Sequence, residues 1–426
     1  MWVAPVTISP EEHHKPPLEF DRKFDPLQAT LMHQLITKIG KGQRGARDLS
    51  WDEAKQAARA MIEGDATPHQ TGAFLMAMRI KLEGVTELAS FSAATRSYVA
   101  PTTAPAGLNV VDVPVYAEKH NTHHVCLPAA IVAASAGAAI LFHGVDNPTV
   151  SSDLPRVLAQ LGIPAALQGD ELAGALQRDG FAYLDLALYH PPLAKLLALR
   201  EQLGAQNLFH QVARLLNPMR AHSQVVGVAH PPYLEKIPEA VTMLGGRRLL
   251  VFQGVEGFPE LSMTTLTTMR ELRDNRVTPL SLKPEDVRLS PGSFQHMAVA
   301  PQPTHGSEHA SPKDIPALEA DMIKRVLHNQ GSRPMSSPSV RPERSMSEVE
   351  GRSGQARYRD WVVYNAAMFL YAGGQAPSIA EGVPLAKRAL DSGAAAKKLA
   401  ALASSPAPLG DSGQPATTPE EKVVHA

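Results

Sequence analysis

A short polar segment near residue 120 carries side chains suited to bind an anion or a metal ion. Residues 114–118 read Pro-Val-Tyr-Ala-Glu, and residues 119–126 read Lys-His-Asn-Thr-His-His-Val-Cys. The segment lies between the strand-like run 109–113 and the uncharged run 125–142, which is where a phosphate-binding loop lies between its strand and helix. Such loops bind phosphate through glycine amides, yet residues 114–118 contain no glycine. The pattern therefore predicts an anion loop whose chemistry has changed.

Three interpretations of this segment remain open. Its histidines and Cys126 are zinc-binding residue types, but adjacent His123 and His124 point apart on most backbones and no standard finger spacing is present. Alternatively, the segment provides a polar, partly cationic ligand cleft. In that case Lys119 and His120 supply the positive charge that arginines commonly supply in an anion site. Otherwise the histidines pack in a closed cleft. A ligand cleft is expected to be lined by Tyr116, Glu118, Lys119, His120, Thr122, His124, His143, Gly144, Asp146 and Asn147.

A basic loop near the N-terminus is a second candidate site. Lys38, Lys41, Arg44 and Arg47 are interleaved with glycines, and no acid follows until Asp48. Cations gathered on one loop can contact phosphates, which predicts salt-sensitive binding of nucleic acid or another polyanion. The alternative is a solvated loop between helices, with basic residues near a helix end. No aromatic residue for base stacking lies nearby.

Length and composition limit the classes of protein that fit. The chain has 426 residues, a net charge of −1 and one cysteine. Two folded domains are expected, since single cores rarely grow past ~250 to 300 residues. The nearly neutral charge confines any nucleic-acid contact to a local patch. The single cysteine excludes an internal disulfide, and no signal-peptide pattern begins the chain, so we expect a cytoplasmic protein.

The uncharged run 125–142 approaches the length of a membrane span. Pro128, Ser135 and Gly137 interrupt it, and small residues are frequent. We therefore expect a buried helix over residues 128–135, a turn at Gly137 and a strand over residues 139–142, with no membrane contact.

Helix signals dominate the first hundred residues. Ser50 with Glu53, and Thr67 with Gln70, have the spacing of capping boxes, and Thr86 is expected to cap a third helix. Beyond residue 101, short β-branched runs alternate with helical patterns, which predicts a largely parallel sheet covered on both faces. The expected strands are 110–113, 139–142, 181–184, 224–228 and 248–253, and the helices between them include 153–161, 169–178 and 235–244.

Several motifs follow one another in an order that carries a family resemblance. They are residues 48–81, 130–137, 143–144, 158–163, 190–191, 199–204, 217–218 and 365–367. Together they resemble the anthranilate phosphoribosyltransferase family, also called glycosyltransferase family 3, whose fold is shared with pyrimidine nucleoside phosphorylases. The resemblance implies a small N-terminal all-helical domain and a larger α/β domain with a mostly parallel sheet.

The resulting domain organisation has five parts. They are a flexible arm at 1–28, a helical domain at 29–97 with a contribution from about 190–215, a glycosyltransferase-like α/β domain at 98–329 and 358–403, a disordered insertion at 330–357, and a flexible tail at 404–426.

The residues that the resemblance makes functional are only partly retained. The family's diphosphate loop, Gly-Thr-Gly-Gly-Asp, falls on residues 114–118, and its Asn-x-Ser-Thr segment falls on residues 124–127, where both hydroxyls are lost. Its Lys-His-Gly-Asn-Arg segment falls on residues 142–146, which keep His143 and Gly144 but replace both cations, one by Asp146.

Three further matches have a functional and a structural interpretation each. The magnesium-binding Asp-Glu pair falls on Pro259 and Glu260, and a single carboxylate is a weak magnesium site. Arg200 matches the arginine that meets the anthranilate carboxylate, although arginines are common on helix surfaces. His143 either binds a ligand at the end of a parallel strand or is a hydrogen-bonded structural histidine.

These differences change the expected function. Phosphoribosyl transfer requires Mg²⁺, amides and cations around the leaving diphosphate, so we expect no ordinary anthranilate phosphoribosyltransferase activity. Residues 40–50 and 208–218 resemble a divergent branch of the family, which implies a homodimer that binds DNA or RNA. The alternatives are an active pentosyltransferase with a changed phosphorylated pentose donor or aromatic acceptor, using Mg²⁺, and a regulatory pseudoenzyme.

Overall fold

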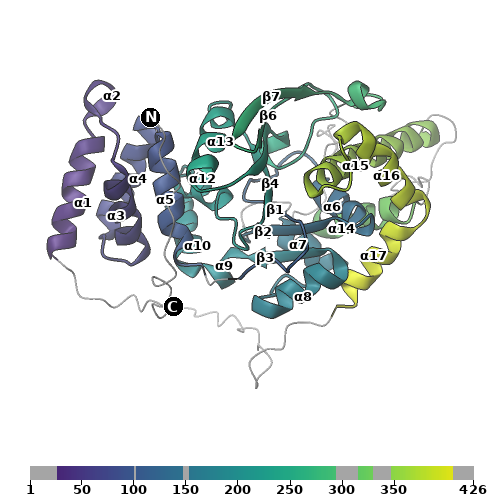
Figure 1. The fold of residues 1–426 in the computed structure, drawn as a ribbon, viewed down its shortest axis with the longest axis horizontal. Coiled ribbons are helices and arrows are strands. Elements are labelled where there is room, and N and C mark those ends of the chain that lie inside the picture. The colour runs from purple at the N-terminus through teal and green to yellow at the C-terminus, as the bar shows by residue number, and fades with distance from the viewer. Residues whose placement is uncertain (1–25, 100–101, 147–152, 294–314, 330–346, 406–426) are drawn as a thin grey trace, which may run out of the picture.

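The computed structural model describes residues 26–99, 102–146, 153–293, 315–329 and 347–405 (Figure 1). The expected arm at 1–28 and tail at 404–426 lie almost entirely outside these residues. None of the helices in the described part is long and apolar enough to cross a membrane.

The N-terminal region forms the expected helical domain. Its helices are α1 (Pro26–Ile39), α2 (Gly42–Gly45), α3 (Trp51–Ile62), α4 (Pro68–Lys81) and α5 (Val85–Arg96). Ser50 and Thr67 cap α3 and α4, and both predicted capping boxes are confirmed. The prediction that Thr86 caps α5 is wrong. Helix α5 begins at Val85, one residue before Thr86, and Gly84 is at the N-cap position. The amide of Gly84 donates a hydrogen bond to the Glu87 carboxylate.

The remainder is built around one seven-stranded sheet. Its order is β3-β2-β1-β4-β5-β6-β7, and the first five strands in that order are parallel. The strands are β1 (Val110–Pro114), β2 (Ala139–Gly144), β3 (Phe181–Asp185), β4 (Ser223–Val228), β5 (Arg248–Gln253), β6 (Thr267–Arg273) and β7 (Arg276–Leu282). The five predicted parallel strands are confirmed, because their apolar β-branched residues are buried on both faces.

The antiparallel hairpin of β6 and β7 was not predicted from the sequence. Most residues of β6 are polar and most residues of β7 are exposed, so neither strand has the continuous apolar run of the parallel strands. The turn contains Asp274 and Asn275, both with positive φ (50° and 63°), which is typical of a two-residue hairpin turn.

One face of the sheet is covered by helices from the middle and the end of the chain (Figure 1). They are α6 (Cys126–Ser135), α7 (Leu154–Leu161), α14 (Ile315–Leu327), α15 (Ser347–Gly373), α16 (Ile379–Asp391) and α17 (Ala394–Ala403). Helix α6 ends at Ser135, and the chain then turns at Gly137, which has φ of 96°, and enters β2. The uncharged run therefore folds as predicted.

The opposite face is covered partly by α13 (Tyr233–Met243), which packs on β5 and β6, while α8 (Gly169–Asp179) covers the β1–β3 end. The helical domain packs on α13, and its core residues share one cluster with α13, α10 (Pro191–Ala198) and α12 (Phe209–Arg214). The short elements α9 (Leu186–Tyr189), α11 (Arg200–Leu203), η2 (Val255–Gly257) and η3 (Pro284–Val287) complete the described chain.

The expected disordered insertion at 330–357 requires a correction. Helix α15 begins at Ser347, so residues 347–357 are helical, and residues 330–346 lie outside the described chain. The polar composition of residues 347–357 predicted disorder, but these residues continue the helix that the buried segment 358–370 forms. A helix that has already nucleated extends at little cost into neighbouring polar residues.

Candidate functional site

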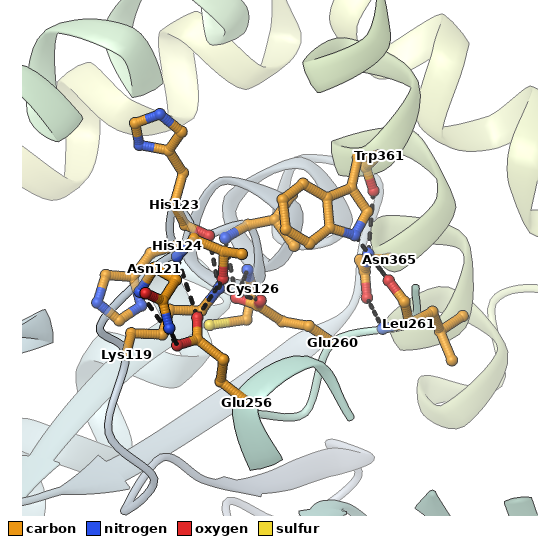
Figure 2. Close-up of polar contacts among 12 residues, drawn as sticks. Lys119, Asn121, His123, His124, Cys126, Glu256, Glu260, Leu261, Trp361 and Asn365 are labelled. Carbon is orange, nitrogen blue, oxygen red and sulfur yellow. Dashed lines mark hydrogen bonds and ion pairs between the residues drawn. The ribbon is translucent and has the colours of Figure 1, made fainter. Parts of the chain in front are cut away.

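The candidate site lies at the carboxyl ends of β1 and β2, where the loop 115–125 leads into α6 (Figure 2). Ligands of parallel sheets bind at this edge, and the first amides of a helix such as α6 have no partner within the helix and can bind an anion. The contacts of Lys119, Glu256 and Glu260 decide whether an external anion can use these amides.

Lys119 and Glu260 form a buried ion pair inside the loop. Lys119 Nζ lies 2.6 Å from Glu260 Oε2, and both side chains have no exposed surface. The ammonium also donates to Thr122 Oγ1 at 2.7 Å and to the His123 carbonyl at 2.6 Å. It therefore presents no charge to a cleft. The expectation that Lys119 lines a cationic pocket is wrong, because the ammonium is turned inward to neutralise Glu260.

The N-terminus of α6 is occupied by the same carboxylate. Glu260 Oε1 accepts hydrogen bonds from the amides of Val125 and Cys126, each at 2.9 Å (Figure 2). These are the amides that an anion at the start of α6 would use. An internal carboxylate thus satisfies them.

A second carboxylate holds the preceding turn of the loop. Glu256 accepts from the amides of His120, Asn121 and Thr122 at 3.0 to 3.1 Å, and from Thr122 Oγ1 at 2.6 Å. Burial raises the pKa of Glu256, but these hydrogen bonds and the charge of Lys119 hold it below its ordinary value. Glu256 therefore stays ionised, in a left-handed conformation with φ of 53°.

These contacts do not fit a magnesium site. Pro259 supplies no ligand, and Glu260 already contacts an ammonium and two amides. Mg²⁺ would have to displace Lys119 and would then find one carboxylate, whereas it usually binds carboxylates together with substrate phosphates.

The zinc interpretation is only partly met. Donor atoms of His124, Cys126 and Glu260 lie within 4.8 Å of one another, and all three residues are buried. His120 stays at the surface, 53% exposed, and the ring of His123 points away from Cys126 (Figure 2). Burial raises the pKa of the Cys126 thiol well above its usual range, and Glu260 raises it further, so the thiol is protonated. With the carboxylate paired to Lys119, the cluster lacks the anionic ligands that zinc requires.

His143 belongs to a buried polar group, and its hydrogen bonds are made at Nδ1 with the hydroxyls of Tyr116 and Tyr189. Its Nε2 lies 3.2 Å from Asp112 Oδ1 on the neighbouring strand, and both side chains are fully buried. Its Nδ1 contacts the hydroxyl of Tyr116 at 2.9 Å, and that hydroxyl contacts the hydroxyl of Tyr189 at 2.8 Å. Tyr116 is 6% exposed, and its ring packs edge-on against that of His143. A Cβ on Gly144 would meet Tyr183 Oη and Val115 Cγ2, each at 2.9 Å, so glycine is required there by packing.

The remaining cleft residues form pairs at the rim. Arg200 forms an ion pair with Glu118, and His120 Nε2 lies 3.4 Å from the same carboxylate. Asp146 lies 3.7 Å from Arg156, and Asn147 is outside the described residues. Arg200 therefore reaches the loop, but an incoming carboxylate would compete with Glu118.

The basic loop lies at the outer end of the helical domain, away from the sheet (Figure 1). Lys38 pairs with Glu53 at 2.6 Å and so contributes to helix packing. Lys41, Arg44 and Arg47 are exposed. The amide of Arg47 donates to the Lys38 carbonyl, which closes the loop and holds these cations close together.

Three residues of the site were missed from the sequence. Glu256 and Tyr189 carry no local signal, because their roles depend on contacts with residues 120–122 and 116. Asp112 does carry one, since an acid within Val-Val-Asp-Val must be compensated when the strand is buried.

Comparisons with known proteins give one consistent family. Two family models match, described as glycosyl transferase family, helical bundle domain, over residues 33–99, and glycosyl transferase family, a/b domain, over residues 118–308. A protein of Rubrobacter xylanophilus named anthranilate phosphoribosyltransferase is 31% identical over 373 residues, covering 87% of this chain and 96% of its own. One of the same name from Chromobacterium violaceum is 28% identical and covers 83% and 93%.

Solved structures show the same fold. Anthranilate phosphoribosyltransferase of Thermus thermophilus gives a TM-score of 0.67 at 24% identity, covering 88% of this chain and 98% of its own. The Saccharomyces cerevisiae enzyme, in complex with PRPP and Mg, gives 0.69 at 18% identity with the same coverage.

Proposed function

The chain belongs to the anthranilate phosphoribosyltransferase family, and from this premise we propose that it is a divergent member that lacks the ordinary transfer reaction and binds nucleic acid or another polyanion. The observation that carries the proposal is the internal ion pair of Lys119 and Glu260 at the start of α6. A diphosphate there would displace Glu260 from two amides and leave a buried carboxylate beside a polyanion.

Charge supports the loss of the diphosphate site. A donor approaching the loop meets Lys119 already neutralised by Glu260, Arg200 already paired with Glu118, and the additional negative charge of Glu256. Transfer requires that negative charge developing on the leaving group be stabilised, and here the local charge would oppose it. Tyr116 also occupies the space that a glycine would leave open.

Polyanion binding is supported by the basic loop. Lys41, Arg44 and Arg47 are exposed on one closed turn, so their charges can act on the same phosphate backbone.

We also propose that the protein is a cytoplasmic homodimer. The helical domain would form the interface, because its residues Ile80 and Leu82 are apolar and 64% and 58% exposed. Light scattering of the purified protein tests the dimer.

Calorimetric titration with phosphoribosyl pyrophosphate and magnesium tests the loss of the donor site. No saturable binding is expected. Saturable binding would favour the second candidate, an active pentosyltransferase with an altered donor or acceptor. The names of the relatives near 30% identity and the position of Arg200 at the loop support that candidate.

Charge reversal tests the polyanion site. Lys41→Glu with Arg44→Glu should weaken binding of a DNA oligonucleotide at least tenfold. The plot of log affinity against log salt concentration should become shallower by the amount expected for the loss of roughly two phosphate contacts. Lys324→Glu, an exposed lysine of α14, is the control. Unchanged binding in the double variant would rule out this loop.

A further inference from the structure

Three arginines lie directly opposite one another on neighbouring strands at one end of the sheet. Arg248 of β5 pairs in register with Arg273 of β6, and Arg273 pairs with Arg276 of β7, which is an edge strand (Figure 1). Residues directly opposite on antiparallel strands project from the same face, and like charges in these positions destabilise a sheet. The row therefore costs stability unless a negative partner compensates it.

One tyrosine holds two of these arginines in place. The Tyr371 ring centroid lies 5.3 Å from the guanidinium carbon of Arg248 and 5.7 Å from that of Arg273. Arg248 Nη2 donates to the Tyr371 carbonyl at 2.6 Å, and the Tyr371 hydroxyl donates to Glu271 Oε1 at 2.6 Å. Because both guanidinium groups are already positioned, they lose little rotamer freedom when an anion binds.

The acids near the row do not neutralise it. Glu271 lies 3.6 Å from Arg273 Nε, and Asp274 donates its amide to the carbonyl of Arg247, which adds a fourth arginine at this end of the sheet. Four arginines thus meet two carboxylates. The Arg273 side chain is 50% exposed, and Arg276 is exposed and has no ion-pair partner among the residues that the structure describes. The cluster therefore presents positive charge to the solvent.

Protection of the sheet edge does not account for the whole row. Charged side chains on an edge strand prevent it from pairing with another chain, which would explain Arg276. Arg248 and Arg273, however, belong to strands that are already paired on both sides.

We propose that Arg248, Arg273 and Arg276 form a second contact surface for a polyanion, and that its ligand is the phosphate backbone of a nucleic acid. The inference rests on the proposed function and adds a surface on the sheet, whereas the basic loop belongs to the helical domain (Figure 1). Neighbouring strands are about 4.8 Å apart, so the row extends about 10 Å. That length suits a run of phosphates better than a single ion. Contacts with phosphates alone carry no base specificity, so binding should not depend on sequence.

Charge reversal on the hairpin tests this surface in the full-length protein. Binding of a fluorescein-labelled single-stranded DNA oligonucleotide is followed by fluorescence anisotropy at several salt concentrations. Arg273→Glu with Arg276→Glu should weaken binding about tenfold or more, and the plot of log affinity against log salt concentration should become shallower by roughly two phosphate contacts. Lys324→Glu with Lys397→Glu, exposed on α14 and α17, makes the same change in net charge and should alter the affinity less than about twofold.

A variant that gains affinity separates binding from an effect on folding. Asp274→Asn removes a negative charge from the hairpin turn, and asparagine readily adopts the positive φ of this residue (50°). This variant should bind the oligonucleotide about twofold to fivefold more tightly. Inorganic phosphate should compete with the oligonucleotide no better than chloride at equal ionic strength, because one ion cannot span the row.

The outcomes distinguish this surface from the function on which it rests. The surface is excluded if the double arginine variant or Asp274→Asn binds like the unmodified protein, if the lysine control weakens binding as much as the arginine variant, or if inorganic phosphate competes strongly. In each of these cases the unmodified protein still binds DNA, so the polyanion function is retained. Absence of binding by the unmodified protein would instead refute the polyanion function and this surface together.

Discussion

Replacing Lys119 by methionine tests whether the loop before α6 is held together by its own charges. Methionine keeps the length of the stem but removes the ammonium, which lies 2.6 Å from Glu260 and has no exposed surface. The Glu260 carboxylate, fully buried, would remain bonded to two amides and lose the ammonium that neutralises it. Removing one partner of a buried ion pair costs about 3 to 5 kcal/mol.

The expected result is a fall of about 3 to 5 kcal/mol in the free energy of unfolding, measured by urea denaturation at neutral pH. Circular dichroism can follow the loss of helix during unfolding. Tryptophan fluorescence can follow the site itself, because the Trp361 ring centroid lies 5.4 Å from the ammonium. Adding Glu260→Gln to Lys119→Met should recover most of the loss, because glutamine retains an oxygen for the Val125 and Cys126 amides without the charge.

Lys324→Met is the matched control, because Lys324 is exposed and should change stability by less than about 0.5 kcal/mol. The reasoning is refuted if Lys119→Met costs less than about 1 kcal/mol, or if the double variant is as unstable as the single one. The first outcome would mean that the amides alone stabilise Glu260, and the second would mean that the loss comes from other contacts of Lys119, such as those with Thr122 and His123.

Three other predictions follow from the same region and its neighbours. Gly227→Ala should destabilise by about 3 kcal/mol in urea denaturation, because a Cβ would lie 2.1 Å from the Phe258 carbonyl; stability like that of the parent would contradict the packing. Glu256→Gln should lower stability above pH 4.5 and lose its effect as the pH falls through the depressed pKa of Glu256, so a pH-independent loss would argue against an ionised carboxylate. Burial lowers the pKa of His190 to about 4 from 6.5, so stability should decline as the pH falls from 6.5 towards 4; His190→Gln should flatten that decline, and an unchanged slope would exclude His190 as its source.

Local sequence signals predicted most of the fold because they describe interactions between near neighbours. The Ser50 and Thr67 caps are satisfied within four residues, and the parallel strands are marked by continuous β-branched runs. The hairpin of β6 and β7 was missed because its strands lack continuous apolar runs and are stabilised by pairing, β6 with β5 and β7 with β6. The start of α15 was missed because its polar first turns continue a helix whose later residues are buried.

The change in the anion loop could be recognised before the fold was known. The absence of glycine at 114–118 is visible in the residues alone, and the replacement of two cations at 142 and 146 is visible once the sequence is compared with the family pattern that it resembles. The contacts that replace the lost chemistry became visible only in the folded chain. The contacts of Lys119 with Glu260, and of residues 120–122 with Glu256, join positions more than 130 apart in the chain. Whether a lysine faces a ligand or an internal carboxylate depends on which strand end lies beside it, and that is a property of the folded sheet.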